Sequence, residues 1–199
     1  GLDVNLKGKA AKEEFQVKKP AVYALMPDDF TGMKPKVVVK ENDVVKVGDS
    51  LFVDKNHPEI KFVSPVSGRV TMVERGDRRK VLSVRVEADA EQQYVDFGKK
   101  NVGQMTAQEV KDLLLESGLF GFFRQRPYDV TANPSDTPKA IFVSAFNSMP
   151  LAADFEYVLR GREADFQAGL DALAKMAKTY LGVSSKQTAT ALTAAKNVE

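Results

Sequence analysis

The chain contains no cysteine, and its only histidine is His57. The lack of cysteine excludes disulfides, thiolate ligation of iron–sulfur clusters or zinc, and a cysteine nucleophile within these 199 residues. A single histidine also excludes a metal site built from several imidazoles. His57 stands beside a proline in a polar stretch with no nucleophile pattern nearby, and a general base needs a positioned partner. We therefore interpret His57 as a solvated surface residue.

Long apolar runs and an excess of charge of one sign are also missing. No apolar run approaches the roughly 20 residues that a membrane-spanning helix needs, so we expect any membrane role to be peripheral. The sequence has 29 basic and 27 acidic residues, a net charge of +2, which leaves no electrostatic footprint for nucleic acid. The sequence opens on Gly1-Leu2-Asp3 without methionine or a signal-peptide pattern, so we expect a trimmed or processed chain.

The first half of the chain has the short apolar pattern of an all-β domain. The run Ala21–Met26 predicts a short buried strand, and the β-branched run Val37–Val39 predicts a second. Later, Val81–Val86 alternates in the manner of a half-buried strand, and the charged stretch Arg75–Arg79 before it predicts a hairpin tip. These elements predict strands joined by short turns.

The most informative stretch of this half is Val39–Val70. Gly48-Asp49 with Leu51 close behind, followed by the corner Ser64–Val70, is the signature of a biotinyl/lipoyl-like barrel-sandwich hybrid. We therefore expect an all-β barrel-sandwich domain at residues 1–103.

A carrier domain of this kind is modified on a hairpin lysine that commonly follows an aspartate, and Lys55 after Asp54 occupies the equivalent region. However, Asn56–Glu59 lengthens the hairpin, and Pro58 disturbs its pairing. An unmodified loop lysine is therefore one interpretation, and a biotinyl or lipoyl carrier modified at Lys55 is the alternative.

From about residue 104 the apolar periodicity becomes helical. Thr106–Glu109 forms a capping box, and Gly118 ends the helix that follows. The continuous apolar run Ala140–Phe146 predicts a strand buried on both faces of a parallel sheet, and a helix is predicted from about Glu163 to Leu181. Strand followed by helix predicts a partial α/β domain at residues 104–183. The tail, residues 184–199, is expected to be a short helix or disordered.

An aromatic and basic cluster follows the first predicted helix. Phe120, Phe122 and Phe123 stand next to Arg124 and Arg126. Three aromatic rings with cationic edges suit a quinone or an isoalloxazine ring, by stacking and by hydrogen bonds to carbonyl oxygens. The competing interpretation is that the phenylalanines pack in the interior and the arginines form ion pairs.

A nucleotide site of the usual kind is not supported by the turn after the predicted strand. Such a site needs a glycine-rich turn whose backbone N–H groups approach the phosphates. Asn147–Leu151 contains no glycine, and its proline removes an N–H donor. We therefore argue against an NAD or FMN site here.

Several motifs in order along the whole chain carry a family resemblance. They are Gly1–Asp3, Thr31–Pro35, Leu51–Asn56, Val63–Gly68, Ser117–Leu119, Arg124–Pro127, Ala140–Ala145, Pro150–Ala153 and Phe166–Asp171. In this order they resemble the A subunit of the bacterial sodium-translocating NADH:quinone oxidoreductase. Family members are longer than this chain, so we expect later domains to be missing and the isolated segment to be inactive.

The resemblance implies a fold and a role. The fold would be a barrel-sandwich hybrid followed by an α/β domain related to the flavin-binding subunit of respiratory complex I. The role would be that of a soluble, peripheral subunit on the cytoplasmic side of the bacterial inner membrane. Its complex oxidises NADH, reduces quinone and exports sodium ions. The partners would be the other subunits and not nucleic acid, and the flavins and iron–sulfur centre would sit on those subunits, with no redox cofactor on this chain.

The family has also been linked to quinone contact. The resemblance places such contact at Leu25–Met33 and Ser117–Tyr128. The candidate residues are Phe30, Gly32, Met33, Phe120, Phe122, Arg124 and Arg126. The related subunit of the ion-motive ferredoxin:NAD oxidoreductase stays open as a third interpretation, and cysteine-rich motifs downstream of this sequence would distinguish it.

Overall fold

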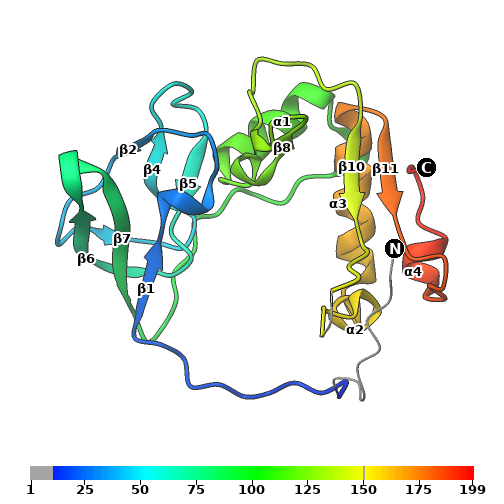
Figure 1. Cartoon of the computed structure of the whole chain (residues 1–199), viewed down its shortest axis with the longest axis horizontal. Helices are drawn as coiled ribbons and strands as arrows, with labels where there is room; N and C mark the ends of the chain where they lie inside the picture. Colours follow the sequence, from blue (N-terminus) through cyan, green and yellow to red (C-terminus); the bar gives the residue numbers. More distant parts are fainter. Residues whose placement is uncertain (1–10, 150) are drawn as a thin grey trace. The chain divides into compact units, whose positions relative to one another are not determined.

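The structure is a computed structural model that describes residues 11–149 and 151–199 (Figure 1). Gly1–Asp3 and Pro150, which carry part of the family resemblance, lie outside the described residues. The chain forms two compact units. The first, here the barrel unit, comprises Lys18–Lys99 and Lys111–Thr137. The second, here the α/β unit, comprises the residues up to Val17, Lys100–Val110 and Pro138–Glu199.

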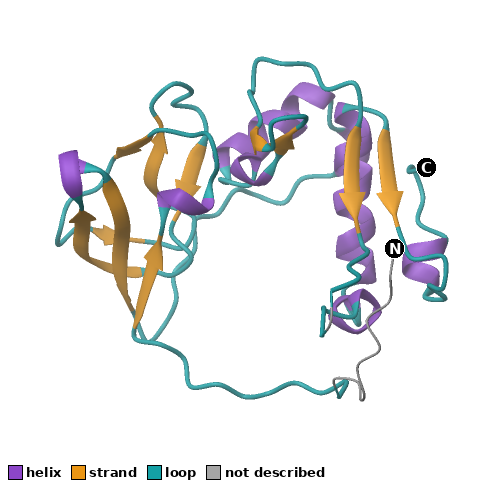
Figure 2. Cartoon of the chain, viewed as in Figure 1, coloured by secondary structure: helices purple, strands orange, loops and turns teal. Residues whose placement is uncertain are grey.

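The barrel unit is built from two antiparallel sheets, which Figure 2 shows as orange arrows. One sheet has the order β1-β7-β6-β3 and the other the order β2-β4-β5. The strands are β1 (Val22–Leu25), β2 (Pro35–Val37), β3 (Val44–Val45), β4 (Ser50–Asp54), β5 (Lys61–Val63), β6 (Gly68–Arg75) and β7 (Val81–Ala88). Leu51, Phe52, Phe62, Val70 and Val84 are each at most 2% exposed and form the core between them.

Several predicted β elements are confirmed, and two differ in detail. The half-buried strand at Val81–Val86 is β7, and the charged tip is the turn η2 (Asp77–Arg79) between β6 and β7. The run Ala21–Met26 gives strand β1, but the prediction that it is buried was wrong. It pairs only with β7, so it is an edge strand, and Val22 is 45% exposed. The strand expected at Val37–Val39 lies two residues earlier, as β2.

Residues 111–137 complete the barrel unit. The helix α1 (Ala107–Glu116) runs into this segment, and Gly118 follows it with a positive φ of 76°, as expected for a helix end. A Cβ on Gly118 would lie 2.6 Å from Val63, and one on Gly121 would lie 2.7 Å from Phe62. The chain is therefore packed directly on β5.

Three short elements follow α1 within this segment. They are the turn η4 (Phe120–Phe122) and the two-stranded ribbon of β8 (Arg124–Gln125) and β9 (Val130–Thr131). The two units therefore do not divide the chain at one point. The domain boundaries expected at residues 103 and 183 stay a prediction.

The α/β unit contains two parallel strands, β10 (Ile141–Ser144) and β11 (Thr179–Gly182), connected through α2 (Phe155–Leu159) and α3 (Glu163–Met176). Its other elements are the turn η3 (Val102–Gln104) and the short helix α4 (Thr190–Thr193) in the predicted tail. No helix of either described range is both long and apolar enough to cross a membrane.

Two predictions for this unit were wrong. The helix expected to reach Leu181 ends at Met176, because Ala177 is extended and Thr179–Gly182 pairs with β10. The strand within Ala140–Phe146 is not buried on both faces, since Phe142 is 77% exposed. A sheet of two strands with helix α3 against β11 leaves the ring of Phe142 uncovered, although it stacks on Tyr180 at 5.1 Å between ring centroids.

Candidate functional site

The structure brings together the two segments that were predicted to contact quinone, Leu25–Met33 and Ser117–Tyr128. The Phe30 ring lies 5.7 Å from the Phe122 ring and 4.4 Å from the Phe62 ring, measured between centroids. Phe62 in turn stacks on Phe52 at 5.1 Å. Phe52 and Phe62 are buried, Phe30 is half-buried and Phe122 is 68% exposed. A row of four aromatic rings therefore runs from the core of the barrel unit to its surface.

Backbone contacts fix this meeting point. Thr131 donates from its backbone N–H (2.8 Å) and from its hydroxyl (3.1 Å) to the carbonyl oxygen of Thr31. Gly32 has a φ of 87°, and a Cβ there would lie 2.7 Å from the Cβ of Val130. Only glycine combines the left-handed backbone with so close an approach. The backbone conformation and the contact with Val130 therefore account for glycine at position 32, without any role in ligand binding.

The two arginines of the cluster are held by Thr31, which follows Phe30, and by Asp129. Arg124 donates to the hydroxyl of Thr31 (Nη2 to Oγ1, 3.2 Å), and its Nε lies 3.6 Å from Oδ1 of Asp129. Nη1 of Arg126 lies 3.7 Å from the same oxygen. Two guanidinium groups thus share one carboxylate, which leaves an excess of one positive charge in the segment that carries Phe122. Thr31 lies inside the predicted segment Leu25–Met33 but was not named among the candidate residues. Asp129 lies one residue beyond the predicted segment Ser117–Tyr128 and was missed.

The candidate aromatic residues do not form one flat slot. Phe120 is 5% exposed and pairs with Phe123 at 5.5 Å, so it lies behind the surface. Phe122 points instead towards Phe30. Packing in the interior therefore accounts for Phe120, and the expected slot of three rings reduces to one exposed ring, Phe122. Met33 is half-buried.

Exposed side chains near Phe122 add to this surface. Leu119 is 53% exposed and Tyr128 is 82% exposed, and both belong to the segment that carries Phe122. The site, here called the aromatic–arginine face, therefore consists of Phe30, Thr31, Gly32, Leu119, Phe122, Arg124, Arg126, Tyr128 and Asp129. Its chemistry is apolar stacking with N–H donors at the edge, which suits a planar ligand that carries carbonyl oxygens.

Lys55 lies apart, on the loop between β4 and β5. It is exposed, and its backbone N–H donates to the carbonyl oxygen of Lys34 (2.7 Å). The preceding Asp54 is 4% exposed and accepts from the backbone N–H groups of Lys34 (3.2 Å) and Asn56 (3.0 Å). Asp54 thus holds the loop in shape, and the hairpin is longer than a two-residue turn, as expected. His57 is half-buried, with Nδ1 at 3.9 Å from Glu59 Oε1.

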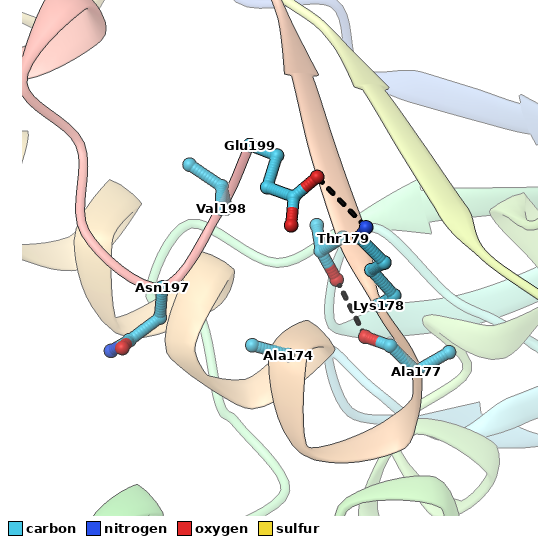
Figure 3. Close-up of a pocket in the computed structure, with 7 residues that line it drawn as sticks. All are labelled: Ala174, Ala177, Lys178, Thr179, Asn197, Val198 and Glu199. Atoms are coloured by element: carbon cyan, nitrogen blue, oxygen red, sulfur yellow. Dashed lines mark hydrogen bonds and ion pairs between the residues drawn. The ribbon is translucent and has the colours of Figure 1, made fainter.

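A hollow lies in the α/β unit, with a volume of about 290 Å³ (Figure 3). It is lined by Ala174, Ala177, Lys178, Thr179, Asn197, Val198 and Glu199. The Lys178 ammonium lies 2.9 Å from the Glu199 carboxylate, whose hydrogen bond raises the pKa of Lys178. The Thr179 hydroxyl donates to the carbonyl oxygen of Ala177 (3.0 Å). These polar groups bind each other, so they do not point to a ligand.

A metal centre is not present in the described ranges. Residues 11–149 and 151–199 contain no group of three or more His, Cys, Asp or Glu side chains that could hold an ion. The aromatic–arginine face therefore remains the candidate site.

Comparison with known proteins gives two family matches in order along the chain. The NqrA N-terminal barrel-sandwich hybrid domain matches residues 1–89, and the NqrA second alpha/beta domain matches residues 105–199. These matches agree with the predicted fold class, an all-β barrel-sandwich hybrid followed by α/β structure.

Curated relatives give the same result. The A subunit of the Na(+)-translocating NADH-quinone reductase from Pseudomonas aeruginosa (strain UCBPP-PA14) is 35% identical over 184 residues, which is 91% of this chain and 41% of the relative. The protein of the same name from Actinobacillus pleuropneumoniae serotype 5b is 36% identical over 178 residues, 88% of this chain and 40% of the relative. The one from Yersinia pestis is 35% identical over 180 residues, with the same two shares. The chain therefore spans about two fifths of the length of these relatives.

Proposed function

Since the chain belongs to the NqrA family, we propose that it is the N-terminal part of the A subunit of a sodium-translocating NADH:quinone reductase. The observation that carries this proposal is the ordered match of two NqrA domains, at residues 1–89 and 105–199. In this role the chain is a peripheral subunit on the cytoplasmic side of the bacterial inner membrane, bound through the other subunits.

We further propose that this part of the protein carries no redox cofactor of its own. The donor set supports this, because no thiolate is available for an iron–sulfur centre and the turn after β10 offers no glycine-rich phosphate cradle. Flavins and the iron–sulfur centre then belong to partner subunits, and this chain contributes to assembly and to contact with quinone.

The test of the subunit role is purification of the tagged protein, expressed from its own gene, from detergent-solubilised membranes. We expect the other reductase subunits to co-purify, identified by mass spectrometry, with sodium-stimulated quinone reduction by NADH. The 199-residue chain alone should have no flavin or iron–sulfur absorption band after gel filtration. A band that persists, or recovery of the tagged protein without reductase subunits, would contradict the proposal.

The quinone contact that we propose uses the aromatic–arginine face. Phe122 presents an exposed ring backed by Phe30, and Arg124, two residues further along the chain, is held by Thr31 and Asp129. A quinone ring stacked on Phe122 would place its carbonyl oxygens within reach of guanidinium N–H donors. The excess positive charge there also favours the reduced, more electron-rich forms of the ring.

The measurement is a titration of the labelled chain with a short-chain quinone, followed by protein chemical shifts. We expect shifts at residues 30–33 and 119–126, and we expect Phe122→Ala to weaken binding about fivefold, the equivalent of about 1 kcal/mol of ring stacking. Phe142→Ala is the matched control, because Phe142 is similarly exposed but lies in the α/β unit. Equal losses in both variants, or shifts confined to other residues, would sink the quinone assignment.

The carrier alternative rests on one observation, the exposure of Lys55 directly after Asp54. Intact mass after co-expression with lipoyl and biotinyl ligases distinguishes the two functions. We expect the unmodified mass, and an adduct that disappears in Lys55→Arg would favour the carrier.

A further inference from the structure

The β6–β7 hairpin (Figure 1) ends in a turn that contains the basic residues Arg78 and Arg79. We call it the basic tip and define it as Arg75, Asp77, Arg78, Arg79 and Lys80. The backbone N–H of Lys80 donates to the carbonyl oxygen of Asp77 (3.0 Å), which closes a four-residue turn. Both central residues have a positive φ, 53° at Arg78 and 62° at Arg79. Positive φ at both central positions is the pattern of a type I′ turn, for which Asn-Gly is the favoured pair.

Two arginines are an unfavourable choice at these positions. Residues with a Cβ and a long side chain are strained in the left-handed region, and such strain is retained where function requires the side chain. The hairpin therefore has a more strained turn than Asn-Gly would give at these positions. In return, two guanidinium groups project from its end.

The three arginines of the tip differ from its lysine in their ion pairing. Lys80 is paired with Asp28 (2.6 Å), and Arg85 further along β7 is paired with Glu74 (2.7 Å). In contrast, the described residues provide no ion pair to Arg75, Arg78 or Arg79, all of which are exposed.

A hydrogen bond also fixes the position of one of these arginines within the turn. Nη1 of Arg75 donates to the carbonyl oxygen of Arg79 (3.3 Å), so its guanidinium is held at the turn. Asp77 is the acidic residue of the turn, and set against the three arginines it leaves an excess of two positive charges at the tip.

We infer that the basic tip is a contact site for the headgroups of anionic phospholipids. Guanidinium groups bind phosphate oxygens in a bidentate manner, and arginine is the side chain suited to this recognition. A bilayer surface offers many phosphates and requires no matching shape, which fits separately exposed arginines at the end of a narrow hairpin. Nucleic acid fits less well, because the tip has no aromatic side chain for base stacking. The inference does not depend on the quinone proposal.

The expected strength is modest. A cationic side chain near an anionic membrane surface contributes roughly a fivefold gain in partitioning, so three arginines give on the order of 100-fold. Such a contact is reversible, but it is strong enough to give measurable partitioning of the chain onto anionic vesicles. In a complex it would orient a protein that is already bound through partners.

The test uses vesicle flotation of the full 199-residue chain. The variant Arg78→Asn with Arg79→Gly removes two cations and also installs the favoured type I′ pair, so the hairpin is retained or stabilised. The matched control is Lys40→Gln with Lys46→Gln, which removes the same charge from exposed lysines elsewhere in the barrel unit.

We expect the chain to float with vesicles that contain phosphatidylglycerol and not with pure phosphatidylcholine. The Asn-Gly variant should partition on the order of 20-fold less, and the control should retain most of the native partitioning. An equal loss of partitioning in the variant and the control would show that only the net charge matters, and it would overturn the assignment of the site to the basic tip. Binding of inorganic phosphate at the tip without flotation would overturn the membrane assignment.

Discussion

Gly68 is the residue at which the larger sheet of the barrel unit is most crowded. It pairs with Val45 on β3 and with Ala88 on β7, and a Cβ there would overlap the carbonyl oxygen of Glu87. Because that oxygen belongs to the backbone of the neighbouring strand, the clash cannot be relieved by a side-chain rotation. We expect Gly68→Ala to lower the free energy of unfolding by about 3 kcal/mol, measured by urea denaturation.

Gly169 provides the control for that substitution. It lies within α3, and nothing stands within 4 Å of the position that a Cβ would take. Gly169→Ala should therefore raise stability by about 0.5–1 kcal/mol, as expected for alanine in a helix. The same destabilisation in both variants would show that the clash with Glu87 is not the cause.

At this scale the sequence predicted the candidate residues better than their arrangement. The aromatic and basic side chains were visible as a cluster, and Gly68 stood out as a corner. That Arg124 would meet Thr31, 93 residues away, could not be read from local patterns. The sequence also could not show that Phe120 lies in the interior and Phe122 on the surface. Phenylalanines close together in sequence look alike until a distant partner such as Phe30 is known.

The N-terminal end of α1 is a helix cap whose strength can be measured. The hydroxyl of Thr106 accepts from the backbone N–H of Glu109 (3.2 Å), and Oε2 of Glu109 accepts from the backbone N–H of Thr106 (2.8 Å). The reciprocal bonds predicted from the sequence are therefore present. Thr106→Ala should cost about 1 kcal/mol of unfolding free energy, measured by thermal or urea denaturation.

The same cap gives stability a dependence on pH. Hydrogen bonds from Thr106, first from its backbone N–H and then from its hydroxyl, lower the pKa of Glu109 below its ordinary value of 4.5. A carboxyl group with a lowered folded-state pKa stabilises above its unfolded value and loses that contribution as pH falls through the folded value. The stability difference between the native chain and Glu109→Gln should therefore narrow below about pH 4.5. An unchanged difference across this window would contradict the cap.

Elements were predictable where local chemistry decides them. The capping box, the glycine after α1 and the hairpin tip between β6 and β7 all follow from short motifs. The strand β11 was missed because apolar residues continue at helical spacing through Ala177 and Tyr180, and only pairing with β10 makes them extended. The burial of β1 was overestimated for the same reason, since an edge strand differs from a central one only through its neighbours.

The whole chain has a discontinuous organisation that can be tested with fragments. The barrel unit includes residues 111–137, in which Gly121 lies against Phe62 and Glu116 pairs with Lys61 (2.6 Å). A fragment that ends at residue 99 would uncover the Phe62 ring, which is 2% exposed in the complete chain. We expect residues 18–99 to be at least about 2 kcal/mol less stable than residues 18–137, measured by denaturant unfolding. Equal stability would assign residues 111–137 to the other unit.

This organisation could not have been predicted from the sequence. The change from alternating to helical periodicity near residue 104 is real, and it was the natural place to divide the chain. However, periodicity describes secondary structure and says nothing of which core a segment joins. The return of residues 111–137 to β5 depends on a close approach at two glycines, Gly118 and Gly121, and on long-range pairing that no local pattern encodes.

The interleaving of the two units has a consequence for the nascent chain. The strands of the barrel unit leave the ribosome before the residues that cover Phe62 have emerged. At about 5–20 residues per second, the interval between residues 99 and 137 lasts a few seconds. During this time an aromatic surface that the finished protein buries is open to solvent and to other chains. Translation of this protein should therefore engage chaperones that hold exposed aromatic segments, and slowing synthesis between residues 99 and 137 should increase aggregation.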